Sequence, residues 1–268
     1  MTAAPRPDLR LLRAVRSGLR ATFPKSVHAY ELSRKCWLEV EEGLLPAVVD
    51  RNRDAADVGA YVGRYAVALA ALARTVYAFE PEAGLAAMLR RAAPSNVRVH
   101  HGAVADRCAT APFHVPVSAG RRNVTNGSLI ASAGTTADTR VVRTTTLDAA
   151  LADADVGFMK IDVEGAERLV LAGARELIGR CRPVVLVEIV GASEVTAVRD
   201  FFAPLGYAGF FVRDGRTLAL TEFTPDMQDR ELHVGPRRQM RFVSNFFFAP
   251  GPAVPGLRSA AGELLAGS

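Results

Sequence analysis

Short apolar runs alternate with helical stretches through the middle of the chain. The apolar runs are AADVGA at 55–60, TVYAFEP at 75–81, NVRVHHGAV at 96–104, VGFMKID at 156–162 and PVVLVEIV at 183–190. Helical spacing of apolar residues predicts helices at 65–74, 82–92, 164–179 and 193–205. Strands that alternate with helices predict right-handed crossovers and a mainly parallel sheet with helices on both faces.

The two ends of the chain and one internal segment break this alternation. The segments 209–221 and 241–251 predict antiparallel strands at one edge, with Asp214-Gly215 as the turn of a hairpin. A turn-rich insertion at about 107–146 contains predicted strands at His114–Ser118 and Arg140–Thr146. We therefore expect three parts, namely a basic, helical extension at 1–50, a main domain at 51–249 and a flexible tail at 250–268.

Composition is that of a soluble globular protein, with 49% apolar and 23% charged residues. No run reaches the roughly 18 apolar residues that a membrane helix needs, and the N-terminus lacks the features of a secretory signal. The three cysteines are far apart, which argues against a zinc site and a disulfide framework. We therefore expect a cytoplasmic protein.

The basic residues are concentrated at the start of the chain. Residues 1–35 contain eight Lys or Arg against Asp8 and Glu31, so this arm carries +6 and the rest of the chain, within a total of +5, carries −1. Such an arm could contact an anionic membrane surface, nucleic acid or an acidic partner. Because the arm has few aromatic residues and the body has no basic stripe, we favour a solvated helix face. We expect no nucleic-acid partner and at most a weak peripheral contact with a membrane.

Acidic residues stand at the carboxyl ends of most of the predicted strands. They are Asp57, Glu80, Asp162 and Glu188. In an open parallel sheet, ligands bind outside these strand ends. Because an uncompensated buried charge is costly, we expect the carboxylates to face a ligand rather than the core.

The segment DVGAYVG at 57–63 predicts a tight strand-to-helix turn that a ligand can approach closely. Glu80 follows Gly63 by 17 residues and ends the neighbouring strand, where a carboxylate can accept both hydroxyls of a ribose. Tyr61 takes the place of the middle glycine of the G-x-G-x-x-G pattern. This argues against a nicotinamide site, which needs close contact with a pyrophosphate, and favours another nucleoside ligand.

The stretch FMKIDVEGAE at 158–167 combines strand and charge. Side chains alternate along a strand, so Lys160 and Asp162 share one face. We expect Lys160 to pair with a neighbouring carboxylate, because an unperturbed lysine is protonated at pH 7. Glu164 is expected to begin the next helix, where its charge favours the helix dipole.

These motifs resemble those of the FkbM-type S-adenosylmethionine-dependent methyltransferases. DVGAYVG, VYAFEP, GAVAD, TTLDAAL, MKIDVEGAE, LVEI and NFFF follow the family pattern in order and spacing between Asp57 and Phe248. The family's first motif reads closer to DVGANIG, so Tyr61 stands where Asn is usual. The resemblance implies an α/β, class I methyltransferase-like (Rossmann-like) fold. Its mainly parallel, seven-stranded sheet would have helices on both faces and an antiparallel edge hairpin.

The resemblance also implies roles for individual residues. The turn Asp57–Gly63, with Gly59 and Ala60, would hold the methionine end of S-adenosylmethionine. The remaining cofactor contacts would come from Glu80 with Pro81 at the ribose, Ala103 and Val104 at the adenine, and Asp162 near the methyl group. The family typically methylates hydroxyls of sugars, antibiotics and other secondary metabolites, so we expect a small-molecule hydroxyl acceptor.

A hydroxyl is a weak nucleophile and needs a general base. The candidates are Asp162, Glu164, Glu188 and His114. As an alternative that we do not favour, Asp162 and Glu188 could hold a divalent metal such as Mg²⁺. The insertion is predicted to bind a polyhydroxylated or phosphate-bearing acceptor through Arg121, Arg122, Asn126 and Ser128.

Two other functions are compatible with these residues. A nicotinamide-dependent oxidoreductase could use a similar sheet, although Tyr61 argues against it. A non-catalytic protein with a cofactor-binding fold could serve as a partner subunit, and a homo-oligomer is also open.

Overall fold

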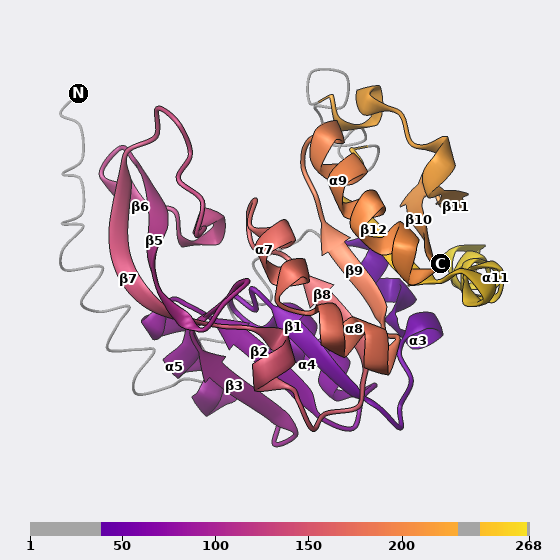
Figure 1. Ribbon diagram of the computed structural model, residues 1–268, viewed down its shortest axis with the longest axis horizontal. Coiled ribbons are helices and arrows are strands. Elements are labelled where there is room, and N and C mark those ends of the chain that lie inside the picture. The colour runs from indigo at the N-terminus through magenta and orange to yellow at the C-terminus, as the bar shows by residue number, and fades with distance from the viewer. Residues whose placement is uncertain (1–38, 230–241, 267–268) are drawn as a thin grey trace, which may run out of the picture.

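The computed structural model describes residues 39–229 and 242–266 (Figure 1). Within these residues, eight strands form the main sheet in the order β11-β10-β12-β9-β8-β1-β2-β3. Their bounds are β1 Asp54–Val58, β2 Val76–Glu80, β3 Val97–His101, β8 Val156–Ile161, β9 Val184–Glu188, β10 Tyr207–Arg213, β11 Arg216–Ala219 and β12 Asn245–Pro250.

Five neighbouring strands of this sheet are parallel, and the rest form an antiparallel edge. Strands β3, β2, β1, β8 and β9 pair in parallel. Strand β12 lies antiparallel between β9 and β10, and β10 and β11 form the predicted hairpin. The mainly parallel sheet with an antiparallel edge is thus confirmed, and β11 adds an eighth strand at the edge.

Helices cover both faces of the sheet, as predicted. One face packs against α6 Leu147–Ala150, α7 Glu167–Ala172, α8 Arg175–Cys181 and α9 Ala192–Phe202. The other packs against α3 Leu45–Val48, α4 Arg64–Ala70, α5 Ala83–Ala92 and α11 Val254–Ala266. Val185 and Val187 face the first layer and Leu186 the second, which explains why this strand is apolar throughout.

Short 3₁₀ helices connect several of these elements. They are η1 Val40–Leu44, η2 Val124–Asn126, η3 Ala203–Leu205, η4 Leu220–Glu222, η5 Pro225–Gln228 and η7 Gly251–Ala253. The predicted basic arm, residues 1–35, lies outside the described residues. No helix in the described ranges is long and apolar enough to cross a membrane.

The single helix predicted at 164–179 is two helices in the structure. The chain breaks at Gly173 between α7 and α8, where a Cβ atom would stand 2.1 Å from the carbonyl oxygen of Ala105. Glu164 lies before α7, in the left-handed region with φ 54°, so it does not begin a helix as expected. Close packing against another segment, which periodicity does not reveal, sets this boundary.

The insertion, together with the short strand β4 that precedes it, forms a second, smaller sheet in the order β4-β7-β5-β6. Its strands are β4 Ala103–Val104, β5 Ala109–Ser118, β6 Arg121–Arg122 and β7 Ala137–Thr145. Strands β5 and β7 form a long antiparallel hairpin that stands out from the main sheet (Figure 1). The two predicted strands of the insertion are therefore present, and each begins earlier than predicted.

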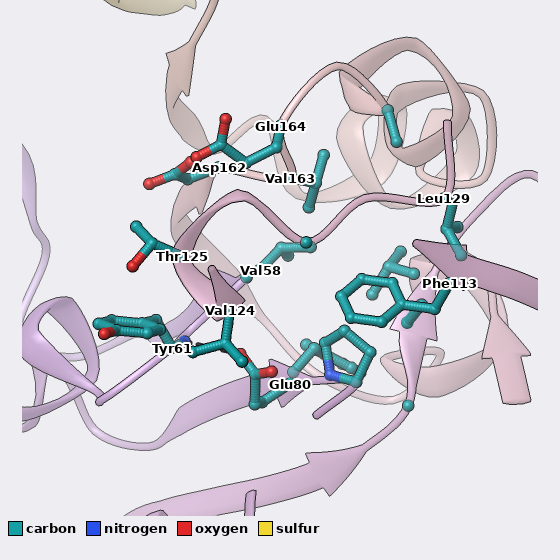
Figure 2. A pocket seen from close by; sticks show the side chains of 18 residues that line it. Val58, Tyr61, Glu80, Phe113, Val124, Thr125, Leu129, Asp162, Val163 and Glu164 are labelled. Carbon is teal, nitrogen blue, oxygen red and sulfur yellow. Dashed lines mark hydrogen bonds between the residues drawn. The ribbon is translucent and has the colours of Figure 1, made fainter. Parts of the chain in front are cut away.

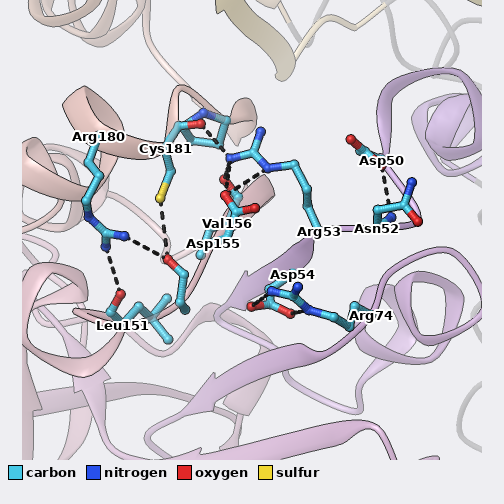
Figure 3. A network of polar contacts seen from close by, with 12 residues as sticks. Asp50, Asn52, Arg53, Asp54, Arg74, Leu151, Asp155, Val156, Arg180 and Cys181 are labelled. Atoms are coloured by element: carbon cyan, nitrogen blue, oxygen red, sulfur yellow. Dashed lines mark hydrogen bonds and ion pairs between the residues drawn. The ribbon is translucent and has the colours of Figure 1, made fainter.

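Hydrogen bonds and ion pairs from two arginines stabilise the end of the sheet at which β1 and β8 begin (Figure 3). Arg53 donates to Asp155 and to the carbonyl oxygens of Val156 and Cys181, at 2.6–2.9 Å. Arg74 donates two hydrogen bonds of 2.9 Å to the carboxylate of Asp54. These contacts hold the starts of β1 and β8 to α8, so the polar groups at this end serve the fold.

The tail differs from the expected flexible segment. Residues 254–266 form α11, which packs against α3, β10 and β11. Val254 and Ala261 are buried in the second helical layer. The prolines and two of the glycines lie at the start of the tail, and the helix forms although Gly262 lies within it.

Replacement of Ala261 by Asp tests this packing. Ala261 is fully buried, so Ala261→Asp should lower the free energy of unfolding by about 2–4 kcal/mol in urea titrations, because a carboxylate would be buried without a partner. Ser259→Asp is the matched control, since Ser259 is exposed on the same helix. Equal stability of the two variants would mean that the tail is flexible, as the sequence predicts.

Candidate active site

The carboxyl ends of β1, β2, β8 and β9 bring the predicted acidic residues to one rim. Strand β1 lies between β2 and β8, with Val58 level with Phe79 on one side and Ile161 on the other. Glu80 ends β2, and Asp162 directly follows β8. Both residues line the same cavity, so the main-sheet register brings them together as the sequence predicts.

This cavity has a volume of about 530 Å³, including open space at its mouth (Figure 2). Tyr61, Thr125 and Asp162 lie at one end and Phe113 and Leu129 at the other in this view. The main sheet and its turns contribute Val58, Gly59, Tyr61, Phe79, Glu80, Pro81, Gly102, Ala103, Val104, Asp162, Val163, Glu164 and Ala166. The insertion contributes Phe113, Val124, Thr125, Gly127 and Leu129. One end is thus polar and the other apolar.

Glu80 is buried and held by backbone amides. Its two carboxylate oxygens accept hydrogen bonds from Tyr61 N at 2.8 Å and Glu82 N at 2.7 Å. Burial raises the pKa of Glu80 to about 7, although these two amides act in the opposite direction. A carboxylate has about four acceptor positions, so Glu80 keeps the capacity to accept hydroxyl groups of a ligand.

The turn after β1 approaches the end of β8 closely. A Cβ atom at Gly59 would stand 1.8 Å from the carbonyl oxygen of Asp162, and Gly59 has φ 85°. The amide of Asp162 donates to the carbonyl of Val58 at 3.0 Å. Only glycine fits position 59, and its presence brings Asp162 against the turn.

Tyr61 has φ 50°, a left-handed conformation that is unfavourable for a residue with a large side chain. Asn tolerates this conformation better, which explains physically why Asn suits the position at which this sequence has Tyr61. The backbone turn is nevertheless formed, because the Tyr61 amide still reaches Glu80. The presence of Tyr61 in place of the usual Asn therefore changes the side chain and leaves the backbone turn intact.

Asp57 is buried at the base of this turn and has an unsatisfied oxygen. Within the described part of the chain, its Oδ2 has no hydrogen-bond partner. Burial raises the pKa of Asp57 to about 7, against the opposing effect of Lys160. A buried acceptor without a partner is rare, and it fits a cationic or amino group of a ligand.

Lys160 balances the carboxylates at the rim. Its Nζ lies 3.6 Å from Asp162 Oδ2 and 3.7 Å from Glu188 Oε2, and it donates to Asn245 Oδ1 at 3.3 Å. The ammonium group also lies 5.3 Å from the centre of the Tyr65 ring. Burial would lower the pKa of Lys160, but the surrounding carboxylates outweigh it and raise that pKa. The expected pairing of Lys160 is confirmed.

Glu188 lies on the other side of Lys160 and interacts with Asp162. Burial and the negative charge of Asp162 raise the pKa of Glu188 above its usual range, whereas Lys160 lowers it. Lys160 thus supplies the positive charge that a metal would supply between these two carboxylates. In the described ranges, no group of three or more His, Cys, Asp or Glu could hold a metal ion.

A second hollow of about 610 Å³ adjoins the cavity and shares Gly59, Tyr61 and Asp162 with it. Asp57 and Lys160 also line it, together with Glu39. Glu39 accepts a hydrogen bond of 2.6 Å from the Tyr65 hydroxyl. The carboxylate cluster therefore faces a hollow that opens beside the polar end of the cavity.

A family model for the methyltransferase FkbM domain matches residues 57–208, which is more than half of the 268 residues. The chain belongs to the FkbM methyltransferase family. The resemblance seen in the sequence and the class I methyltransferase-like fold are therefore confirmed. A comparison with curated proteins found no match.

Several solved structures are similar to this FkbM-family chain at low identity. The methyltransferase FkbM from Methylobacillus flagellatus KT is 16% identical with a TM-score of 0.46. The match covers 74% of this chain and 44% of that chain, so this chain spans less than half the length of that protein. A precorrin-6y C5,15-methyltransferase from Geobacter metallireducens GS-15 is 14% identical with a TM-score of 0.42, and the match covers 78% and 87% of the two chains. TYW2 from M. jannaschii, solved in complex with AdoMet, is 11% identical with a TM-score of 0.38, and the match covers 80% and 78%.

The structure separates the predicted residues of this FkbM domain into two groups. Most line the cavity or the adjoining hollow: Asp57, Gly59, Ala60, Glu80, Pro81, Ala103, Val104, Asp162 and Glu164. Gly63 lines neither, but it has φ 81°, and a Cβ atom there would stand 2.3 Å from Leu89. Its role is to let α4 begin close to α5.

The predicted insertion residues lie elsewhere. His114 and Asn126 line a separate hollow on the hairpin. Ser128 is buried, its hydroxyl accepts from Ile130 N at 3.0 Å, and it lines no described hollow, so it holds the loop together. Arg121 is exposed on β6, and Arg122 forms ion pairs with Asp138 at 2.7 Å and Glu82 at 3.6 Å.

Sequence reasoning missed the apolar residues that the insertion contributes. Phe113, Val124 and Leu129 line the cavity, and the Phe113 ring packs so closely on Gly127 that a Cβ there would stand 2.5 Å away. Alternation in PFHVPVS, with Phe113 and Val115 on one face, was the available signal. It indicates a buried face but does not reveal which ligand site that face covers.

Raised carboxyl pKa values predict how stability changes with pH. Asp57 and Glu80 have folded-state pKa values of about 7 against ordinary values of 3.8 and 4.5, so their stabilising contribution is lost as the pH rises toward and through 7. Without ligand, the free energy of unfolding in urea should fall between pH 5.5 and pH 8 by on the order of 1–2 kcal/mol per group.

The double variant Asp57→Asn, Glu80→Gln should flatten this pH dependence, whereas Glu176→Gln on the surface of α8 should retain it. Because histidines titrate in both proteins, the difference between the two slopes isolates the carboxyl groups. Identical slopes would contradict the assignment of raised pKa values to these residues.

Proposed function

We propose that this protein is an S-adenosylmethionine-dependent O-methyltransferase that methylates a hydroxyl of a sugar, glycoside or related secondary metabolite. Membership of a methyltransferase family supports the reaction class. The observation that carries the proposal is the continuity of the nucleoside-sized cavity, through Gly59, Tyr61 and Asp162, with the hollow that holds Asp57 and Lys160. A cofactor cavity and a carboxylate cluster thus meet at Asp162.

The cavity fits the parts of the cofactor. Ala103, Val104 and Phe113 are buried and form an apolar end suited to an adenine ring. Glu80, next to Pro81, is pre-positioned by two backbone amides to accept ribose hydroxyls. The unsatisfied oxygen of Asp57 would accept a hydrogen bond from the amino group of the methionine end, beside the Gly59–Ala60 turn.

When bound, S-adenosylmethionine supplies a methyl group to the acceptor oxygen as the carbon–sulfur bond breaks with its electron pair on sulfur. The hydroxyl proton must then pass to a group of the protein. Asp162 is the best placed, because it lines both hollows. Glu188 lines neither hollow, but it lies beside Asp162, and Lys160 pairs with both carboxylates. The raised pKa of Glu188 favours proton acceptance near neutral pH.

Other functions considered from the sequence have less support. A nicotinamide-dependent oxidoreductase has no counterpart in the family match. Lys160 already supplies a cation between Asp162 and Glu188, so the proposed reaction uses no metal. Incubation of the protein with methyl-labelled S-adenosylmethionine and host extract tests the function. Labelled product is expected on a hydroxylated small molecule, and cofactor binding without any labelled product would favour a non-catalytic partner subunit.

Removal of the Glu80 carboxylate should weaken cofactor binding. Glu80→Ala is expected to cost about 1.5–3 kcal/mol in calorimetric titrations with S-adenosylmethionine, the range for hydrogen bonds to a charged group. Glu176→Ala, an exposed glutamate on α8, should bind as tightly as the unchanged protein. Thermal unfolding of both variants checks that the turn bonded to Glu80 remains folded. Unchanged affinity of Glu80→Ala would refute the ribose assignment.

The proposed base is tested by replacing each carboxyl group with its amide. Asp162→Asn and Glu188→Gln should each lower kcat by about 10²–10⁴-fold, the usual contribution of general-base catalysis. The kcat/KM of the unchanged enzyme should fall as the pH drops below the raised pKa of Glu188. If His114→Ala abolished turnover while both amide variants retained it, the base would lie in the insertion instead.

A further inference from the structure

The β5–β7 hairpin carries a hollow of its own, which the cofactor and the carboxylate cluster do not use. It has a volume of about 520 Å³ and lies between the hairpin and the returning loop. Its principal lining residues are His114, Asn126, Ile130, Ser132, Thr135 and Thr139. We call it the insertion hollow.

The chemistry of this hollow is neutral and mixed. An imidazole, an amide and three hydroxyls can each donate and accept hydrogen bonds, and Ile130 adds an apolar surface that is 48% exposed. In the described ranges, no Lys, Arg, Asp or Glu lines the hollow. Neutral donors and acceptors beside an apolar surface suit a sugar ring, which presents hydroxyls at its edge and C–H groups on its faces.

The walls of the hollow are pre-formed. His114 exchanges backbone hydrogen bonds with Ser128 at 2.8 and 3.0 Å, and its Nδ1 lies 3.0 Å from Thr139 Oγ1 on the neighbouring strand. The pairing of β5 with β7 continues on both sides of this contact. A ligand would therefore meet an ordered surface, which lowers the entropic cost of binding.

One loop separates the insertion hollow from the cofactor cavity. Along 124–130, Val124, Thr125, Gly127 and Leu129 line the cavity, whereas Asn126 and Ile130 line the hollow. Asn126 Nδ2 also donates to Glu164 Oε2 at 3.3 Å, and Glu164 lies at the cavity. The two sites thus share a wall at the end of the cavity where Asp162 lies.

The arginines of the insertion do not add charge to this hollow. The sequence predicts that they help to bind a polyhydroxylated or phosphate-bearing acceptor, but Arg122 is held by Asp138 and Glu82. Neither Arg121 nor Arg122 lines the hollow. An anionic group placed there would lose its hydration without gaining a cation, so the hollow disfavours a nucleotide sugar.

We propose that the insertion hollow binds a neutral sugar ring of the acceptor, next to the unit that is methylated, so that extended neutral glycosides are the preferred acceptors. The inference rests on the proposed function and narrows its substrate class. Hydrogen bonds from Asn126, Ser132 and Thr139 to the hydroxyls of this second ring would orient it. Binding energy gained away from the reacting hydroxyl would position it for attack.

The test compares two tryptophan substitutions on the same face of β7. Thr139→Trp fills the hollow, whereas Val141→Trp, two residues along the strand and 76% exposed, lies outside it. Methyl monoglycosides and the corresponding methyl diglycosides of glucose, galactose, mannose and rhamnose are the probes. Their binding is measured by saturation-transfer NMR in the presence of S-adenosylhomocysteine. Ala131→Trp, in the loop on the opposite wall, replaces Thr139→Trp if the latter fails to fold.

At least one diglycoside should bind the unchanged protein about tenfold more tightly than its monoglycoside, because a pre-formed subsite for the second ring adds binding free energy. Thr139→Trp should abolish this difference and Val141→Trp should keep it, with S-adenosylhomocysteine affinity equal in all three proteins. No diglycoside preference, an equal loss in both variants, or tighter binding of a UDP-sugar would overturn the inference. Absence of S-adenosylhomocysteine binding would instead refute the proposed function, and the two failures are thus distinguishable.

Discussion

The ammonium group of Lys160 lies within 3.7 Å of carboxylate oxygens from Asp162 and Glu188, in a position that is only 1% exposed. Without this cation, the acidic ends of β1, β8 and β9 would repel one another at a rim where Asp57 is buried and Asp162 and Glu188 are only partly exposed. An apolar cluster of similar volume would often stabilise a fold at least as well. We therefore infer that the charges are retained for the chemistry of the rim, and that Lys160 is the residue that makes their retention compatible with folding.

Backbone strain is concentrated at the same rim. Gly59 and Asp162 approach so closely that no side chain fits between them. Tyr61 and Glu164, which flank this approach along the chain, both adopt the left-handed conformation. Non-glycine residues held in this conformation are frequent at functional sites, because the surrounding structure must fix them. Here the hydrogen bonds of Tyr61 to Glu80 and of Asn126 to Glu164 help to fix both residues, so the contacts that shape the cavity also hold the strained turns.

Periodicity was sufficient to predict the parallel strands. The acidic residues that meet at the rim could also be predicted, because Asp57, Glu80 and Asp162 mark the strand ends locally. Periodicity could not place β12 between β9 and β10, since antiparallel pairing at an edge depends on contacts distant in sequence. The helix break at Gly173 depends on the carbonyl of Ala105, and the order of the tail depends on its packing against α3. Likewise, the polar residues of the insertion could be identified, but not the side of the loop to which each points.

The loop 124–130 shows why that last distinction matters. Val124 and Leu129 complete the apolar wall of the cavity at the strand ends, so this cavity is incomplete without the insertion. Asn126 and Ile130, on the other side of the same loop, face the insertion hollow. Because different residues of the loop form the two surfaces, we expect that changes at Asn126 or Ile130 could alter the insertion hollow while the wall of the cavity is kept. Asn126 also contacts both sites, because it lines the insertion hollow and donates a hydrogen bond to Glu164 at the cavity. Under the proposed function, cofactor binding and acceptor choice would therefore meet at this loop, while the main sheet supplies the charged residues of the rim.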